Sequence, residues 1–419
     1  MGFKFIHAAD IHLDSPLRGL SAYENAPVDQ LRNASREALK ELITKAIEDK
    51  VSFVVFAGDL YDGDWRDYNT GIFFAGQMGR LAKAGIRAYV LHGNHDADSE
   101  MTKRLALPDN VAVFNSRSAH VHKIDELKVA LHGQSFSNRA VEDNLAASYK
   151  ARVDGYFNIG VLHTALQGYA AHASYAPCTV DELHAKGYDY WALGHVHEYQ
   201  KWEGPSTIVF PGNLQGRHVR ETGRKGAVSI TVGDSGHSVV DRLYLDVLRW
   251  EVVNVDVSQC ATFEDVARKV GQGLTSLLEA DDVPRAVRVI LGGKTRLHGA
   301  LFGSAAALRA QVLAQAAAID AEQIWVEKVR VSTTPVDTPQ AAGESREALT
   351  ELRAIFDEAG TDPEFLEELQ QQLQPFLNKV SDDVNEDVPL LALVRQKRFA
   401  DLVQEVAPSL LAQLSSKVL

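Results

Sequence analysis

Short apolar segments alternate with segments of helical periodicity along the first half of the chain. Five apolar segments are predicted to be buried strands: 3–9, 51–57, 86–91, 156–162 and 188–193. Between the first three of them, apolar residues recur at three- and four-residue spacing over 29–50 and 70–84, which indicates amphipathic helices. Strands that alternate with helices in this way predict an α/β fold with a mainly parallel sheet.

Polar side chains follow each of these strands at the point where it ends. The five motifs are Asp10-x-His12, Gly58-Asp59-Leu60-Tyr61-Asp62, Gly93-Asn94-His95-Asp96, His163 and Gly194-His195-Val196-His197. Because open α/β sheets bind ligands beyond the carboxyl ends of their strands, the motifs are expected to meet at one site. Carboxylate, imidazole and amide donors can hold two divalent cations, which clamp the attacking and leaving oxygens of a phosphate ester. The pattern therefore predicts a two-metal phosphoesterase.

Individual residues of this set are expected to have different roles. Asp10 and His12 are two residues apart, so both side chains are predicted to point to the same side at the end of a strand. Gly58 is expected to permit a tight turn before Asp59. Asp59 is the candidate for the carboxylate that bridges both metals, because one carboxylate has two oxygens. The neutral amide oxygen of Asn94 suits Mn²⁺ or Mg²⁺ better than a metal that prefers sulfur ligands. His95 is expected beside the metals, where its imidazole could protonate the leaving oxygen. Asp62 or Asp96 could orient His95, although Asp62 fits the alternative of a helix cap equally well.

A basic, glycine-punctuated segment follows the last motif closely, at 213–226. It is predicted to lie near the site and to contact the phosphates of a substrate, whereas the alternative is a solvated hairpin loop. Its candidate substrate-binding residues are Arg217, His218, Arg220, Arg224 and Lys225. His172, in the loop after His163, is a further candidate for substrate contact.

The second half of the chain predicts further units. The segments 207–211, 226–232 and 238–244 alternate in hydrophobicity and are interpreted as antiparallel additions to the sheet. A strand–helix–strand–helix–strand order then predicts a small α+β unit without a catalytic constellation. The domain boundaries are predicted as 1–248 for the first domain, 249–334 for the α+β unit, 335–343 for a linker and 344–419 for a helical C-terminal region.

Composition refines this interpretation. The formal net charge of the chain is −13, but residues 336–389 alone contain fourteen Asp and Glu against three Lys and Arg. The metal-ligand half is therefore close to neutral, and bound cations would make its site positive. The only two cysteines, Cys178 and Cys260, form neither a zinc motif nor a disulfide framework, which favours a reducing compartment. With no signal peptide or membrane-spanning run apparent, a cytoplasmic protein is expected.

Taken together, the five motifs resemble those of the calcineurin-like metallophosphoesterase superfamily. Within it, the segment 9–17 (ADIHLDSPL) is similar to the opening of SbcD-like DNA repair exonucleases, specifically their YhaO branch. The segments 175–178 and 215–226 resemble the same branch. The resemblance covers 3–244, and the second domain in layout only. It implies a four-layer αββα sandwich, then a small α+β capping domain and a C-terminal helical region.

The resemblance also implies a ligand set and an activity. Two divalent cations are expected, Mn²⁺ before Mg²⁺. One would be held by Asp10, His12, Asp59 and His197, and the other by Asp59, Asn94, His163 and His195. His95 would be the catalytic histidine that binds no metal. The implied reaction is phosphodiester hydrolysis by a metal-activated water, as in a DNA exonuclease or endonuclease.

The implied partners are DNA, a second copy of the chain and a coiled-coil ATPase of the SbcC type, which in this branch is the YhaN type. The acidic C-terminal region is interpreted as a module that docks this ATPase, or alternatively as helices packed on their own chain. Two other functions compete with the nuclease. One is a small-molecule phosphodiesterase or nucleotide phosphoesterase with the same dimetal site, and the other is a non-enzymatic scaffold, which the intact ligand motifs disfavour.

Overall fold

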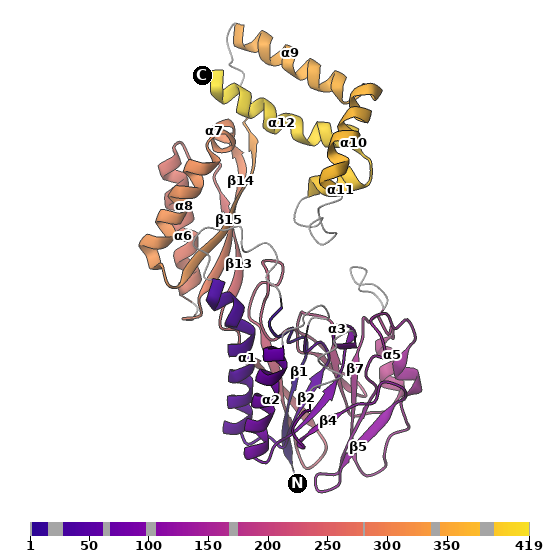
Figure 1. The fold of residues 1–419 in the computed structure, drawn as a ribbon. Helices are drawn as coiled ribbons and strands as arrows, with labels where there is room; N and C mark the ends of the chain where they lie inside the picture. Colours follow the sequence, from indigo (N-terminus) through magenta and orange to yellow (C-terminus); the bar gives the residue numbers. More distant parts are fainter. Residues whose placement is uncertain are drawn as a thin grey trace. The chain divides into compact units, whose positions relative to one another are not determined.

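Figure 1 shows a computed structural model of the chain. The structure describes residues 2–15, 28–61, 68–97, 106–166, 175–279, 281–336, 344–377 and 389–418. It divides into two compact units, which are considered separately. The first comprises Met1–Val252 with Asp281–Val287, and the second comprises Val253–Ala280 with Arg288–Leu419.

Two six-stranded sheets form the centre of the first unit. In the first sheet the order is β12 (Ser238–Tyr244), β11 (Gly226–Val232), β1 (Phe3–Ala8), β2 (Phe53–Ala57), β3 (Arg87–Leu91) and β4 (Val111–Val113). In the second sheet it is β5 (His120–Ile124), β6 (Val129–Gly133), β7 (Phe157–His163), β8 (Tyr190–Gly194), β10 (Thr207–Phe210) and β9 (Gln200–Trp202). The central strands of both sheets are parallel, and β5, β9, β11 and β12 pair antiparallel.

Strand residues alternate between two buried surfaces, because successive side chains of a strand point to opposite faces. Phe5 and Phe53 of the first sheet pack with Val161 and Tyr190 of the second, so the two sheets share one core. On its other face, the first sheet packs against α1 (Val28–Glu48) and α2 (Tyr68–Lys83), which lie side by side in Figure 1. Trp191 lies on the outer face of the second sheet, in a cluster that includes Leu183 of α5 (Val180–Ala185). The four-layer αββα sandwich is thereby confirmed.

The structure corrects the strand predictions at two places. The segment 207–211 was expected to be an antiparallel addition, but β10 pairs parallel with β8. Strands β4, β5 and β6 were not predicted. Strand β4 is an edge strand of the first sheet, and β5 and β6 supply one side of the second sheet. Each is only three to five residues long, and polar side chains such as His120 and His122 interrupt the apolar pattern of β5.

The second unit contains a three-stranded sheet, in which β13 and β14 begin with residues of the first unit. Its strands are β13 (Arg249–Asp256), β14 (Arg285–Thr295) and β15 (Ile324–Pro335), and its helices are α6 (Phe263–Leu278), α7 (His298–Gly303) and α8 (Ala305–Asp320). Helix α6 begins at a capping box, where the side chains of Thr262 and Asp265 each accept from the backbone N–H of the other. The strands and helices of this unit follow the predicted order. Residues 337–343 of the predicted linker lie outside the described residues.

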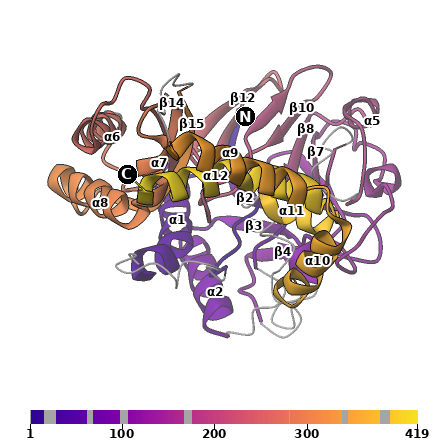
Figure 2. The same cartoon turned by 90° about the horizontal axis from the view of Figure 1, so that it is seen from above.

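The C-terminal helices are α9 (Glu344–Ala359), α10 (Pro363–Leu377), α11 (Pro389–Arg395) and α12 (Phe399–Val418). Helix α12 contacts the other three, and it lies beside α9 in both views (Figures 1 and 2). Val394, Phe399 and Leu402 form a small buried cluster with apolar residues of α10. Part of the apolar surface of these helices is thus covered within the chain, and their docking to a partner stays a prediction. None of the described helices combines the length and hydropathy that crossing a membrane requires.

Gly160 of β7 provides a test of the packing between strands. A Cβ atom at this residue would lie 2.3 Å from Cε3 of Trp191, whose ring is fully buried. We expect Gly160→Ala to lower the free energy of unfolding by about 1–3 kcal/mol through overpacking. Gly76→Ala is the matched control, because this exposed position in α2 has open space, and alanine should stabilise the helix by about 0.5–1 kcal/mol. Urea denaturation measures both, and equal effects of the two substitutions would contradict the packing described.

Candidate metal centre

Backbone hydrogen bonds join the loop after β1 to the loop after β2. The N–H of Asp10 donates to the carbonyl oxygen of Gly58, and the N–H of His12 to that of Asp59, both at 3.0 Å. These bonds continue the pairing of β1 and β2 beyond the ends of the strands. They bring the first two motifs of the sequence together at the carboxyl edge of the first sheet.

The backbone of these loops is left-handed at the residues that carry the polar side chains. Asp10, His12 and Asp59 have φ angles of 51°, 43° and 51°, and His195 has 103°. The alternation of an extended strand, which was predicted to align Asp10 with His12, is therefore the wrong reason for their proximity. Non-glycine residues in this region cost about 1–3 kcal/mol each, and such strain is typical of functional sites.

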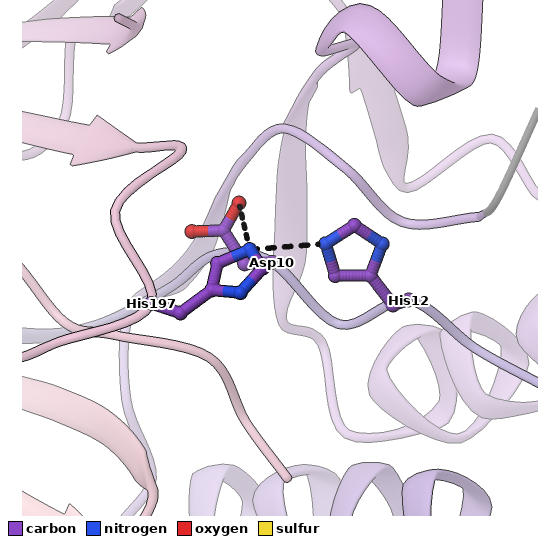
Figure 3. Close-up of side chains that lie close together, drawn as sticks. All are labelled: Asp10, His12 and His197. Carbon is purple, nitrogen blue, oxygen red and sulfur yellow. Dashed lines mark hydrogen bonds and ion pairs between the residues drawn. The ribbon is translucent and has the colours of Figure 1, made fainter. Parts of the chain in front are cut away.

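Figure 3 shows the first group of side chains, Asp10, His12 and His197. The Nε2 atoms of His12 and His197 are 3.3 Å apart, and Nε2 of His197 is 4.0 Å from Oδ1 of Asp10. Asp10 and His12 are buried, whereas His197 is partly exposed. The structure thus brings the first and last motifs of the sequence to one point.

A second group contains Asp59, His163 and His195, with Asn94 beside it. Nε2 of His163 is 3.3 Å from Oδ2 of Asp59 and 3.0 Å from Oδ1 of Asn94. Nδ1 of His195 lies 3.3 Å from the same nitrogen of His163. All four residues are buried, so a cation bound here would be largely removed from solvent.

Asp59 connects the two groups. Its Oδ2 atom, which faces His163, is also 3.9 Å from Nε2 of His12 in the first group. Its Oδ1 atom accepts the backbone N–H of His95 at 3.0 Å, and His12, Asp59 and His95 form a third candidate group. The carboxylate of Asp59 therefore lies between the two groups, and its bridging of two cations stays a prediction.

The spacing of the donor atoms fits coordination of metal ions. Two ligands at about 2.1 Å from one ion, separated by about 90–109°, are roughly 3.0–3.4 Å from each other. The distances within the two groups, from 3.0 to 3.3 Å for the closest pairs, lie in this range. Nitrogen and oxygen donors without sulfur suit Mn²⁺ and similar ions.

Hydrogen bonds from outside the groups turn two of the imidazoles toward the centre. Nδ1 of His163 donates to the carbonyl oxygen of Ala57 at 3.0 Å, and Nδ1 of His197 donates to Oε1 of Glu221 at 2.8 Å. Since both acceptors lack a proton, each Nδ1 carries a hydrogen, which leaves each Nε2 as the nitrogen that could bind a cation. Glu221 was not predicted from the sequence, because a single Glu in a basic loop belongs to no ligand motif.

The glycines of the motifs permit this close approach. Gly58 has a φ angle of 101°, and a Cβ atom there would lie 2.3 Å from Nδ1 of His163. At Gly194, a Cβ atom would lie 2.0 Å from the carbonyl oxygen of Ala57. The tight turn expected at Gly58 is present, and both glycines also leave room for the bond between His163 and Ala57.

In the absence of cations, the buried charges perturb one another. Burial raises the pKa of Asp10 to about 6, although His197 and His163 oppose the rise. Burial alone would lower the pKa of His163, but Asp59 outweighs it and raises that pKa to about 9. Without a metal ion, a proton on His163 therefore partly neutralises the charge of Asp59. Metal binding is expected to replace and release this proton.

Asp96 connects the loops after β2 and β3. Its carboxylate accepts the backbone N–H groups of Leu60, Tyr61 and Gly93 at 2.9–3.1 Å. Burial, and then the charge of Asp59, raise its pKa to about 7. These bonds give Asp96 a role in shaping the loops, and its predicted role in orienting His95 stays a prediction. Asp62, the alternative orienting residue, lies outside the described residues.

Several side chains of the basic segment, 213–226, form contacts within the chain. Nη2 of Arg217 is 2.9 Å from Oε1 of Glu221, and Nε2 of His218 is 3.6 Å from the same oxygen. The buried Lys225 donates from Nζ to the carbonyl oxygen of His197 at 2.9 Å. These contacts support the loop that carries His197.

Two other predicted substrate-binding residues of this segment face solvent. Arg220 is exposed, and Arg224 is exposed while forming an ion pair with Asp281 at 3.1 Å. His172 lies outside the described residues. Substrate contact by the basic segment and by His172 stays a prediction.

Comparisons with known proteins agree with this architecture. The family model for calcineurin-like phosphoesterases matches residues 3–199, and the model for the middle domain of metallophosphoesterase YhaO matches 250–334. The uncharacterized metallophosphoesterase YhaO of Bacillus subtilis is 36% identical over 296 residues, which cover 69% of this chain and 71% of that protein.

More distant relatives are named as DNA double-strand break repair protein Mre11. The protein from Methanopyrus kandleri is 24% identical over 309 residues, 67% of this chain and 65% of that protein. The protein from Thermoplasma acidophilum is 22% identical over 289 residues, 66% of this chain and 73% of that protein.

The contact between Glu221 and His197 can be tested by metal binding. Glu221→Gln removes the charge that orients His197, so the affinity for Mn²⁺ should fall about 10–100-fold, as for other partners of metal ligands. Isothermal titration calorimetry measures this affinity. Glu203→Gln is the matched control, because Glu203 is exposed and pairs with Lys201 at the surface. Unchanged Mn²⁺ affinity in Glu221→Gln would contradict the assigned role.

Proposed function

Because this chain belongs to the calcineurin-like metallophosphoesterases of the YhaO type, we propose that it is a metal-dependent DNA nuclease. One observation carries the proposal: two groups of metal-ligand side chains lie next to each other and are connected through Asp59. Two cations at such a spacing suit in-line displacement at a phosphodiester. Support for DNA as the substrate comes from the relatives named as DNA double-strand break repair proteins.

The proposed ligands divide into two sets that share Asp59. One set is Asp10, His12, Asp59 and His197, and the other is Asp59, Asn94, His163 and His195. When bound, the two cations would activate a water molecule and neutralise the charge that develops on the phosphate. Mixed nitrogen and oxygen donors favour Mn²⁺ over Mg²⁺, because Mg²⁺ prefers oxygen ligands.

His95 is proposed as the general acid. The backbone N–H of His95 donates a hydrogen bond to Oδ1 of Asp59 at 3.0 Å. His95 is the second residue of the short helix α3 (Asn94–Ala97). Its ring meets the ring of His12 edge-on, with centroids 5.0 Å apart, and it stays partly exposed. From the rim of the first group, the imidazole can donate a proton to the sugar oxygen that leaves when the phosphodiester is cleaved.

We further propose that the chain acts as a homodimer with an SbcC/YhaN-type coiled-coil ATPase. The candidate docking surface is on the C-terminal helices, where Ile355, Phe365 and Phe376 are exposed apolar side chains. The acidic charge of 336–389 disfavours DNA contact by this region, since DNA affinity depends on neutralising phosphates with cationic side chains.

Substitutions at His95 and Asp59 should separate catalysis from metal binding. His95→Ala should keep Mn²⁺ binding and lower the rate of hydrolysis about 10²–10⁴-fold, the usual contribution of general acid catalysis. Asp59→Ala should lose the metals themselves. Calorimetry with Mn²⁺ and hydrolysis of a chromogenic phosphodiester measure the two effects. A wild-type rate in His95→Ala would show that His95 is not the acid.

The substrate is tested with end-labelled single-stranded and duplex DNA in Mn²⁺, with Asp59→Ala as the control for contaminating nuclease. Degradation by the wild-type chain alone is the expected result, and the product lengths give the polarity. Hydrolysis of small phosphodiesters without DNA degradation, both alone and with the ATPase partner, would favour a small-molecule phosphodiesterase instead.

A further inference from the structure

Alternating aromatic and cationic side chains form a stack at one edge of the two-sheet sandwich. Cζ of Arg242 lies 4.4 Å from the ring centroid of Tyr199 and 4.8 Å from that of Tyr244. Cζ of Arg224 lies 4.9 Å from the ring centroid of Tyr244. These four residues, Tyr199, Arg242, Tyr244 and Arg224, are called the Tyr–Arg stack below.

The stack joins the edges of both sheets. Arg242 and Tyr244 belong to β12, the edge strand of the first sheet, and they share one face because they are two residues apart. Tyr199 directly precedes β9, the edge strand of the second sheet. The stack therefore crosses the opening between the sheets, where no further strand pairs with β9 or β12 among the described residues.

The stack lies at the same end of the sandwich as the metal-ligand groups. Tyr199 follows His197 by two residues, and Lys225, which neighbours Arg224, donates to the carbonyl oxygen of His197. Tyr199 and Arg224, the two ends of the stack, therefore lie close in sequence or by a direct neighbour to the loop that carries His197, a proposed metal ligand.

The strand register gives the approximate distance between the stack and the site. Tyr244 is paired with Gly226 of β11, and β11 pairs with β1, whose carboxyl end leads to Asp10. Neighbouring strands are about 4.8 Å apart, so Tyr244 lies on the order of 10 Å across the sheet from the end of β1.

The stack presents positive charge and aromatic surface to solvent. Tyr244 is 46% exposed, and Arg242 and Arg224 are exposed as well. Within the described part of the chain, no carboxylate lies at ion-pair distance from Arg242, and the neighbouring Asp241 points to the opposite face of β12. Arg224 is already paired with Asp281 at 3.1 Å, so Arg242 is the cationic side chain of the stack that suits an anionic ligand.

We propose that the Tyr–Arg stack binds single-stranded DNA and holds it beside the dimetal site. Bases would stack on the rings and on the guanidinium planes, and Arg242 would pair with a phosphate. Such stacking tolerates any sequence, because every base has an aromatic face. This inference rests on the proposed nuclease function, and it adds where the substrate strand is held outside the metal centre.

Binding of a fluorescently labelled single-stranded oligonucleotide to the full chain in EDTA tests the stack without cleavage. Tyr244→Ala and Arg242→Ala should each raise the Kd about tenfold, and Tyr244→Phe, which keeps the ring, should bind like the wild type. Arg242→Ala should also lower the salt dependence of binding, by about 0.7 in the logarithmic slope. Thermal unfolding of each variant checks that the fold is kept.

The chain offers a matched control at the other end of the sandwich. Nζ of Lys128 lies 5.1 Å from the ring centroid of Tyr156. Tyr156 directly precedes β7, and His163 is the last residue of this strand, so the pair lies at the opposite end of β7 from His163. Tyr156→Ala and Lys128→Ala remove the same kind of contact and should leave the Kd unchanged.

The outcomes separate the stack from the nuclease proposal. Hydrolysis of a chromogenic phosphodiester should be unchanged in all stack variants, because none of them changes a proposed metal ligand or His95. Wild-type affinity in both alanine variants, or equal losses in the Tyr156 and Lys128 controls, would overturn the stack as a binding site while DNA cleavage by the wild type could still be observed. Absence of DNA cleavage together with stack-dependent binding would overturn the nuclease proposal alone.

Discussion

The hydrogen bonds between the loops after β1 and β2 are the constraint on which the rest of the site depends. They extend the parallel pairing past the strand ends, from Asp10 and His12 to Gly58 and Asp59, while the backbone turns left-handed. With that turn, the side chains of both loops lie near one point. His163 from β7, with His195 and His197 after β8, approaches from the second sheet, so the centre lies where the two sheets meet at their carboxyl ends.

This arrangement concentrates charge in a buried place. Asp10 and Asp59 are almost inaccessible to solvent, and burying a carboxylate without compensation is costly. Without cations, protonated His163 offsets the charge of Asp59 and the pKa of Asp10 rises. Divalent cations would compensate the charges of Asp10 and Asp59 and release the proton from His163. The need for this compensation favours metal binding by the strained loops.

Much of the fold and site could be predicted because each motif directly follows an apolar strand. The strand ends bring Asp10, Asp59, Asn94 and His163 to the carboxyl edges of the two sheets, and the loops then set how their side chains meet. The reason predicted for the pairing of Asp10 with His12 was wrong, because positive φ angles cannot be read from an Asp-x-His pattern. Glu221 and the Tyr–Arg stack were also missed, since both depend on contacts between segments far apart in the chain.

The most direct test of the central claim is anomalous X-ray diffraction at the manganese absorption edge from crystals grown with Mn²⁺. Two manganese peaks are expected in each chain. One should lie among Asp10, His12 and His197, the other among Asn94, His163 and His195, with Asp59 between them. A single peak, or peaks away from these side chains, would contradict the dimetal centre.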